Sequence, residues 1–239
     1  MWPLAVTIVV FLLLLIWWRL SPRNKLEIML KRALLILAML LSTACSWSTD
    51  SESAIGRVND VKGNPRLFRG HRYLELGPDS NIEIHDSIIT GLSDKLQVTL
   101  RDGTIVRVGQ DSELTIQEYS GRARPARLRL TSSGGQYRVT TGKLFRRDGS
   151  SLEIGTPVVT ILSGSADLLV EHAVDAGTLT VVQLGSDSIR IKNQFGETEL
   201  LHQGEMSTIS FGLLPSQPAQ IEKSELDAAI ESTSLLIRR

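Results

Sequence analysis

Apolar residues dominate the first part of the chain, and a short alternating pattern replaces them after residue 54. Residues 1–18 are almost wholly apolar. As a helix this run would be about 27 Å long, close to the hydrocarbon thickness of a bilayer. Trp17 and Trp18 stand where an interfacial aromatic belt is expected, and Arg19 follows them. The pattern predicts a transmembrane segment over residues 1–20.

A second apolar stretch, residues 29–45, has the layout of a secretory signal. Basic residues precede a short apolar run at 33–41, and the small residues Ser42-Thr43-Ala44 follow it. Cys45 then makes the stretch similar to a bacterial lipoprotein lipobox, which implies that its thiol is acylated and becomes the new N-terminus. Ser42 departs from that pattern, in which Leu is usual. The alternative is a second transmembrane helix with an incidental cysteine.

Two accounts reconcile these two segments. Either translation starts at Met29, or both segments cross the membrane as a helical hairpin whose basic link, residues 19–32, stays cytoplasmic. Both accounts place everything after residue 45 outside the inner membrane. By resemblance to sorted lipoproteins, Ser46 favours the outer membrane, although the choice between the two membranes stays open. The small polar residues 46–54 predict a flexible tether.

Residues 55–211 alternate apolar and polar positions, with turn residues between the runs. In residues 96–109 the apolar Leu96, Val98 and Leu100 are separated by polar side chains. Asp102-Gly103 then predicts a two-residue hairpin turn in which both residues have positive φ. The other runs with a strand pattern are 112–119, 126–132, 151–155, 157–162, 166–172, 178–185, 188–193 and 205–211. Their spacing predicts an all-β domain built as a sandwich, a barrel or a β-solenoid.

The last part of the chain has a helical pattern. A Pro-containing linker leads into residues 219–239, where Ile221, Leu226, Ala229 and Ile230, and in a longer helix Leu236, share one stripe. We expect a short C-terminal helix here. It either caps an open end of the β-domain, which is the interpretation we favour, or docks another envelope protein.

Charge and composition bear on the class of partner. Residues 1–45 hold five basic side chains and one acidic one, so the rest of the chain holds 21 basic and 25 acidic ones. This mildly acidic body argues against nucleic acid as a partner, because phosphate binding needs a concentrated positive surface. The only cysteine is Cys45, so an intrachain disulfide is excluded.

The candidate reactive groups do not form a recognisable site. The four histidines have no metal-ligand spacing; they are His71, His85, His172 and His202. Neither Ser132-Ser133-Gly134-Gly135 nor Ser163-Gly164-Ser165 has a nucleophile-elbow or phosphate-loop context, and turns explain both better. We therefore predict no catalytic, metal-binding or cofactor-binding residue, and a protein that is not an enzyme.

One local concentration of positive charge stands out, at residues 122–129. Arg122, Arg124 and Arg127 belong to it, and Gly121 and Pro125 indicate a loop that enters a strand. A solvated loop is the simplest interpretation. The functional hypothesis is a contact for an acidic partner or for lipid head groups.

An ordered set of short motifs makes the body similar to the FecR domain family. These motifs are Asp-x-Ile-x-Thr-Gly at 86–91, Asp-Gly at 102–103, Ser-x-Leu-x-Ile at 112–116, Thr-Pro at 156–157 and Gly-Ser at 164–165. At the last step the family usually has Arg-Gly-Thr, where this chain has Ser163-Gly164-Ser165. From the residues alone, Asp86 with Thr90-Gly91 is a turn builder, Thr156-Pro157 starts a strand, and Gly164 marks a bulge or close backbone packing.

The resemblance implies a twisted, β-helix-like or β-solenoid-like domain. The family is named for periplasmic regulators of ferric-citrate uptake, and its full sigma-regulating members carry a cytoplasmic domain that holds the sigma factor. This chain has no cytoplasmic stretch long enough for that. We therefore expect a membrane-anchored binding or signalling module in the periplasm that recognises an envelope protein or a small ligand. The alternative is a structural scaffold lipoprotein of an envelope complex.

Overall fold

The computed structural model describes residues 53–121 and 123–234 of the 239-residue chain. These residues belong to one compact unit, residues 51–239. The predictions for the membrane segment 1–20, for the stretch 29–45 with Cys45, and for most of the tether lie outside the described residues. No described helix is both long enough and apolar enough to cross a membrane.

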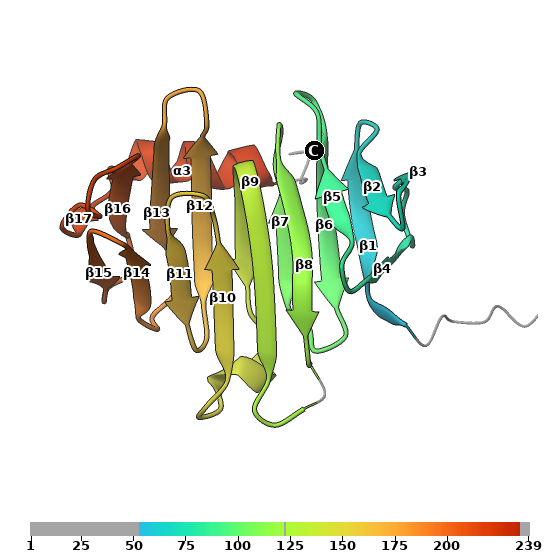
Figure 1. Cartoon of the computed structure of the whole chain (residues 1–239), viewed down its shortest axis with the longest axis horizontal. Helices are drawn as coiled ribbons and strands as arrows, with labels where there is room; N and C mark the ends of the chain where they lie inside the picture. The colour runs from blue at the N-terminus through green and yellow to red at the C-terminus, as the bar shows by residue number, and fades with distance from the viewer. Residues whose placement is uncertain (1–52, 122, 235–239) are drawn as a thin grey trace, which may run out of the picture. The chain divides into compact units, whose positions relative to one another are not determined.

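The described chain forms two β-sheets (Figure 1). Sheet A contains, in spatial order, β4 (Asn81–Glu83), β1 (Ala54–Lys62), β6 (Lys95–Leu100), β7 (Ile105–Val108), the second half of β9 (Arg127–Thr140), β12 (Asp167–Ala173), β13 (Thr178–Gln183), β16 (Glu205–Ser210) and β17 (Ala219–Gln220). Sheet B contains β3 (Arg72–Glu75), β2 (Arg66–Arg69), β5 (Ser87–Ile89), β8 (Glu113–Tyr119), the first half of β9, β10 (Ser151–Gly155), β11 (Thr160–Ser163), β14 (Ile189–Asn193) and β15 (Gly196–Leu200). Among the described strands only β9 and β10 pair in parallel.

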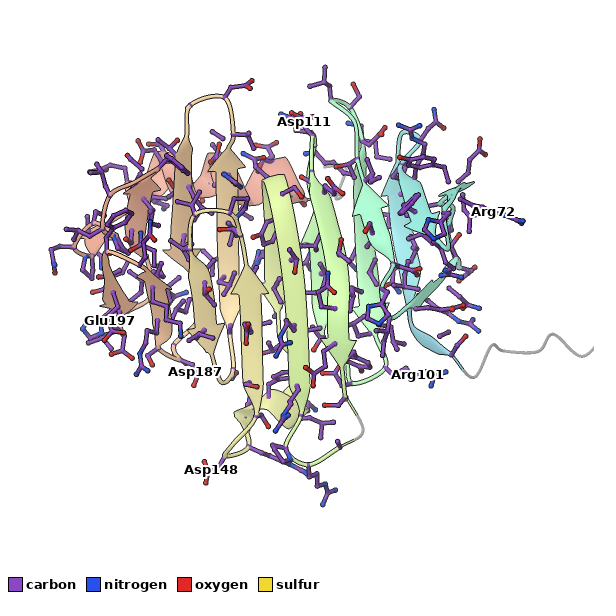
Figure 2. All side chains as sticks on the ribbon, in the orientation of Figure 1. Arg72, Arg101, Asp111, Asp148, Asp187 and Glu197 are labelled. Atoms are coloured by element: carbon purple, nitrogen blue, oxygen red, sulfur yellow. The ribbon has the colours of Figure 1, made fainter. Side chains whose placement is uncertain are left out.

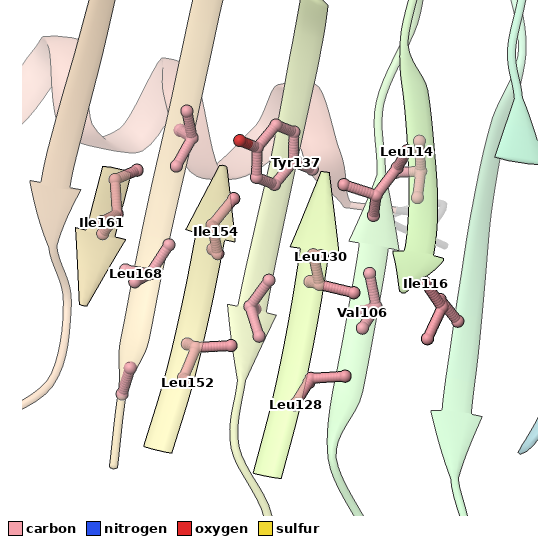
Figure 3. Close-up of a cluster of buried hydrophobic side chains, with 14 of the residues drawn as sticks. Val106, Leu114, Ile116, Leu128, Leu130, Tyr137, Leu152, Ile154, Ile161 and Leu168 are labelled. Atoms are coloured by element: carbon pink, nitrogen blue, oxygen red, sulfur yellow. The ribbon is translucent and has the colours of Figure 1, made fainter. Parts of the chain in front are cut away.

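The two sheets face each other across one apolar core. Side chains alternate along each strand, so every second residue points inward. In β6, Leu96, Val98 and Leu100 are buried while Gln97 and Thr99 are partly exposed, as the sequence pattern predicts. Figure 3 shows the central part of this core, with side chains from both sheets meeting between them. The all-β prediction is confirmed, whereas the solenoid-like arrangement stays a prediction.

Strand β9 belongs to both sheets because it bends in its middle. Residues 127–134 pair with β8 in sheet B, and residues 135–140 pair with β7 and β12 in sheet A. The bend includes Gly135, whose φ is 90° and whose missing side chain leaves room for the backbone of Ser112. The prediction of an ordinary turn at Ser132–Gly135 is therefore wrong. A bulge lets one long strand change sheets there.

The C-terminal helix α3 (Lys223–Thr233) covers the outer face of sheet A. Leu226, Ala229 and Ile230 of this helix pack on a second apolar cluster, formed by Leu169, Val182 and Leu184. These three residues place apolar side chains on the outer face of sheet A. The apolar stripe of α3 covers them. The helix therefore lies on a sheet face. The expectation that it caps an open end of the β-domain is wrong. It begins at Lys223, after the short strand β17.

Two turns differ in detail from their prediction. In the β6–β7 hairpin only Gly103 has positive φ, so the prediction of positive φ is wrong for Asp102. Asp102 accepts hydrogen bonds from the Thr104 hydroxyl at 2.6 Å and from the Tyr119 hydroxyl at 2.8 Å. Thr156-Pro157 forms the turn between β10 and β11 instead of starting a strand. The Thr156 hydroxyl oxygen accepts the backbone N–H of Val159 at 3.0 Å, which closes that turn.

Candidate functional site

The parallel pairing of β9 with β10 brings two loops together that are distant in sequence. Arg127, at the start of β9, pairs with Ser151, at the start of β10. The loop before β9 and the loop before β10 therefore emerge side by side. Figure 1 shows both loops in the protrusion below β9 and β10, beside the short 3-10 helix η1 (Lys143–Arg146).

Hydrogen bonds and one buried aromatic ring fix the two loops to each other. The backbone N–H of Ala126 donates to Ser150 Oγ at 3.2 Å, and the backbone N–H of Ser151 donates to the Ala126 carbonyl at 3.0 Å. Ser150 Oγ also donates to the carbonyl of Leu144 in η1 at 3.2 Å. Phe145 is 1% exposed and anchors η1 in the core. These contacts hold the two loops in a fixed position relative to each other.

This end of the sandwich carries a cluster of exposed cations, which we call the basic end. Its members are Arg124, Arg127, Lys143, Arg146 and Arg147. None of the five forms an ion pair with a described acid. The only acidic residue in the described part of the two loops is Asp148, whose position at the tip Figure 2 shows. Five cations beside one anion make a locally positive surface on a body that is otherwise slightly acidic.

The neighbouring Arg129, unlike the cations of the basic end, lies close to two acidic side chains. It lies on the outer face of sheet B, 3.6 Å from Glu118 and 3.5 Å from Glu153. With Arg127 these acids line a shallow hollow of about 240 Å³. Because Glu118 and Glu153 offset the charges of Arg127 and Arg129 in the hollow, the uncompensated positive charge of the basic end is carried by Arg124, Lys143, Arg146 and Arg147.

The sequence located only part of the basic end. Arg124 and Arg127 were predicted as contact residues, and the structure places both on it. Arg122 lies outside the described residues. Lys143, Arg146 and Arg147 were missed, because nothing in the sequence showed that β10 pairs in parallel with β9. The run Lys-Leu-Phe-Arg-Arg was the available signal, since its central Phe145 indicates a loop packed against the core.

A network centred on Asp86 shows what the first family motif does. Asp86 is fully buried, and its carboxylate accepts hydrogen bonds from Arg69 Nε at 2.7 Å, from Arg69 NH2 at 2.5 Å and from the backbone N–H of Glu83 at 2.6 Å. The hydrogen bonds to Asp86 raise the pKa of the Arg69 guanidinium above its ordinary value. Asp86 is a turn builder, as predicted, and it is also the buried partner of an ion pair with the half-buried Arg69 that the sequence did not reveal.

Other candidate reactive groups are engaged in structural contacts. Ser163 Oγ donates to the carbonyls of Ser165 and Ser188, at 2.6 and 2.9 Å. Burial lowers the pKa of His172, whose Nδ1 has no partner among the described residues. The described residues contain no group of three or more His, Cys, Asp and Glu side chains placed to hold a metal ion.

A second hollow, with polar and apolar lining residues, is present at the turn between β14 and β15. It measures about 380 Å³ and is lined by residues that include Pro157, Phe195 and Phe211. Phe195 is 51% exposed and Phe211 is 77% exposed. Nothing in the described chain covers this hollow or fixes what would occupy it.

The comparison with protein families agrees with the motif-based resemblance. Residues 86–186 match the family described as FecR protein. No protein with a curated description matches the chain. Two crystal structures of a proposed anti-sigma factor from Parabacteroides distasonis ATCC 8503, at 1.65 and 2.50 Å resolution, are similar to it, with 14% identity and a TM-score of 0.49. Each match covers 60% of this chain and less than two thirds of the other chain, 64% and 63% respectively.

Proposed function

We propose, on the premise that residues 86–186 form a FecR-family domain, that this chain is a binding and signalling module of the bacterial cell envelope. In this proposal an N-terminal anchor holds the β-domain on the extracytoplasmic side of a membrane. The family match carries the proposal, since every motif that suggested the resemblance falls inside the matched residues. The all-β architecture, with the exposed outer face of sheet B, suits a module that binds another protein.

The carboxylates of the matched region support a role in binding rather than in catalysis. Asp86 holds Arg69 and a turn, and Asp102 holds Tyr119 and Thr104. Asp167 accepts two hydrogen bonds from Arg138, each 2.8 Å long. Each of these three carboxylates is therefore engaged in hydrogen bonds that hold the fold together.

The proposed membrane anchor is supported by the sequence alone. Residues 1–20 and 29–45 are the apolar segments, and Cys45 is the lipidation candidate. Intact mass of the mature protein, with and without globomycin, tests the anchor directly. An acylated chain that begins at Cys45 indicates a lipid anchor, and a full-length chain in the membrane fraction indicates a helical hairpin. A full-length chain that is found only in the cytosol would refute the anchor.

The signalling role is tested by the way a partner associates. The full chain would be cross-linked in cells and purified in mild detergent, under growth conditions that differ in the candidate stimulus. Association that changes with the stimulus supports signalling. A constant stoichiometric complex supports the alternative, a scaffold lipoprotein of an envelope complex. A chain that forms no complex under any of these conditions would refute both roles.

A further inference from the structure

We propose that the basic end binds the anionic phospholipid headgroups of the membrane that anchors the chain. The inference rests on the proposed function for the anchor, and it adds a binding surface and an orientation. The surface consists of Arg124, Arg127, Lys143, Arg146 and Arg147. Their charge, their position at the end where the chain enters the domain, and the short tether each support it.

The described chain enters the β-domain at the same end as this surface. The carbonyl of Ile55, at the start of β1, accepts the backbone N–H of Arg101 at 2.9 Å. The next residue, Asp102, lies against Gly142, since a Cβ on Gly142 would be 2.3 Å from the Asp102 carbonyl oxygen. Gly142 directly precedes η1 and its cations. Figure 2 shows Arg101 at the lower end of sheet A, the end from which the tip with Asp148 also projects.

The tether limits how far the domain can move from its anchor. Residues 46–53 separate Cys45 from the first strand, and eight extended residues span at most roughly 28 Å. A strand of eight residues, such as the first half of β9, has a similar length. A chain anchored at or before Cys45 therefore keeps the entry end of the domain within about one domain length of the lipid surface. The basic end belongs to that entry end.

Charge selects an anionic lipid surface over an acidic protein as the occupant. All five cations are exposed, no exposed aromatic side chain lies among them, and the hollow beside them carries two acids, Glu118 and Glu153. Protein interfaces usually centre on anchor side chains that fill pockets of the partner, whereas a lipid surface needs only clustered charge near the membrane. Each cation close to such a surface strengthens the association by roughly fivefold. The acidic remainder of the body would be repelled, which favours one orientation.

The test uses the full chain reconstituted in nanodiscs of pure phosphatidylcholine or of phosphatidylcholine with phosphatidylglycerol. Hydrogen exchange, measured by mass spectrometry, reports protection of a peptide that covers residues 142–150. The variant Arg146→Glu/Arg147→Glu removes two cations of the basic end. Lys62→Glu/Arg72→Glu makes the same change in charge at exposed positions away from it. Lys62 is at the opposite end of β1 from Ala54.

We expect severalfold slower exchange of this peptide in anionic discs than in neutral discs. The difference should disappear in 1 M salt, where the screening length falls to about 3 Å. It should also be lost in Arg146→Glu/Arg147→Glu and kept in the control. Equal exchange in both lipids, while the chain stays in the discs, would overturn the inference, leave the anchor intact and favour an acidic protein. A chain that leaves both kinds of disc would refute the anchor itself.

Discussion

Removing the buried carboxylate of Asp86 tests whether the first family motif is a structural network. In Asp86→Ala the Arg69 guanidinium loses both of its hydrogen bonds to Asp86, and the backbone N–H of Glu83 loses its acceptor. Breaking a buried ion pair by deleting one partner typically costs about 3–5 kcal/mol. The Arg69 side chain is 30% exposed and can regain some hydration, so we expect the lower part of that range, about 3 kcal/mol.

Urea unfolding of residues 46–239, followed by circular dichroism, measures this free energy. Glu83→Gln is the matched control, because Glu83 contacts the same Arg69 through a single hydrogen bond of 2.9 Å and is 28% exposed. It should cost less than about 1 kcal/mol. If Asp86→Ala lost no more stability than Glu83→Gln, the buried pair would not be a stabilising network and our interpretation of the motif would be wrong.

Three further predictions concern the bend, the buried histidine and the helix. Gly135→Ala should lower the free energy of unfolding by about 3 kcal/mol or more, because residue 135 has a left-handed φ and a Cβ there would clash with Ser112. Gly103→Ala is the control in the same urea assay; its φ is also positive but the space around it is open, so it should cost only about 1 kcal/mol. Because burial lowers the folded-state pKa of His172, its contribution to stability is complete above pH ~6.5 and declines as the pH falls below that value. His172→Gln should flatten this decline in unfolding curves measured between pH 5 and pH 8, and an unchanged slope would contradict it. Leu226→Ala should loosen α3 from sheet A at a cost of about 1 kcal/mol, seen as faster hydrogen exchange in the helix, since this side chain is only partly buried.

The alternating pattern predicted the strands well because burial acts on every second residue. The register of β6 and β7 follows from Leu96, Val98 and Leu100, which must all face the same core. Asp86 was identified as a turn builder because that role depends on residues within a few positions of it. The stripe on α3 likewise predicted the helix, although not the sheet face that it covers.

Features that depend on distant contacts could not be predicted in this way. Ser112 packs against Gly135 at the bend of β9, and no local pattern places these two residues together. Arg69 is 17 residues from Asp86, and their pairing depends on how β2 lies beside β5. The sequence predicted only part of the basic end for the same reason. Its second loop reaches the first only through the parallel pairing of β9 with β10.

The central claim is that the β-domain works on the extracytoplasmic side of the membrane, and labelling of one introduced thiol tests it most directly. Leu92 is 77% exposed in the loop between β5 and β6, so Leu92→Cys presents a reactive thiol without disturbing the core. A membrane-impermeant maleimide would be added to spheroplasts that express the full chain, with the unaltered chain as the control for Cys45. We predict labelling of Leu92→Cys while the cytoplasmic membrane is intact. Labelling that occurs only after lysis would place the domain in the cytoplasm and contradict the account.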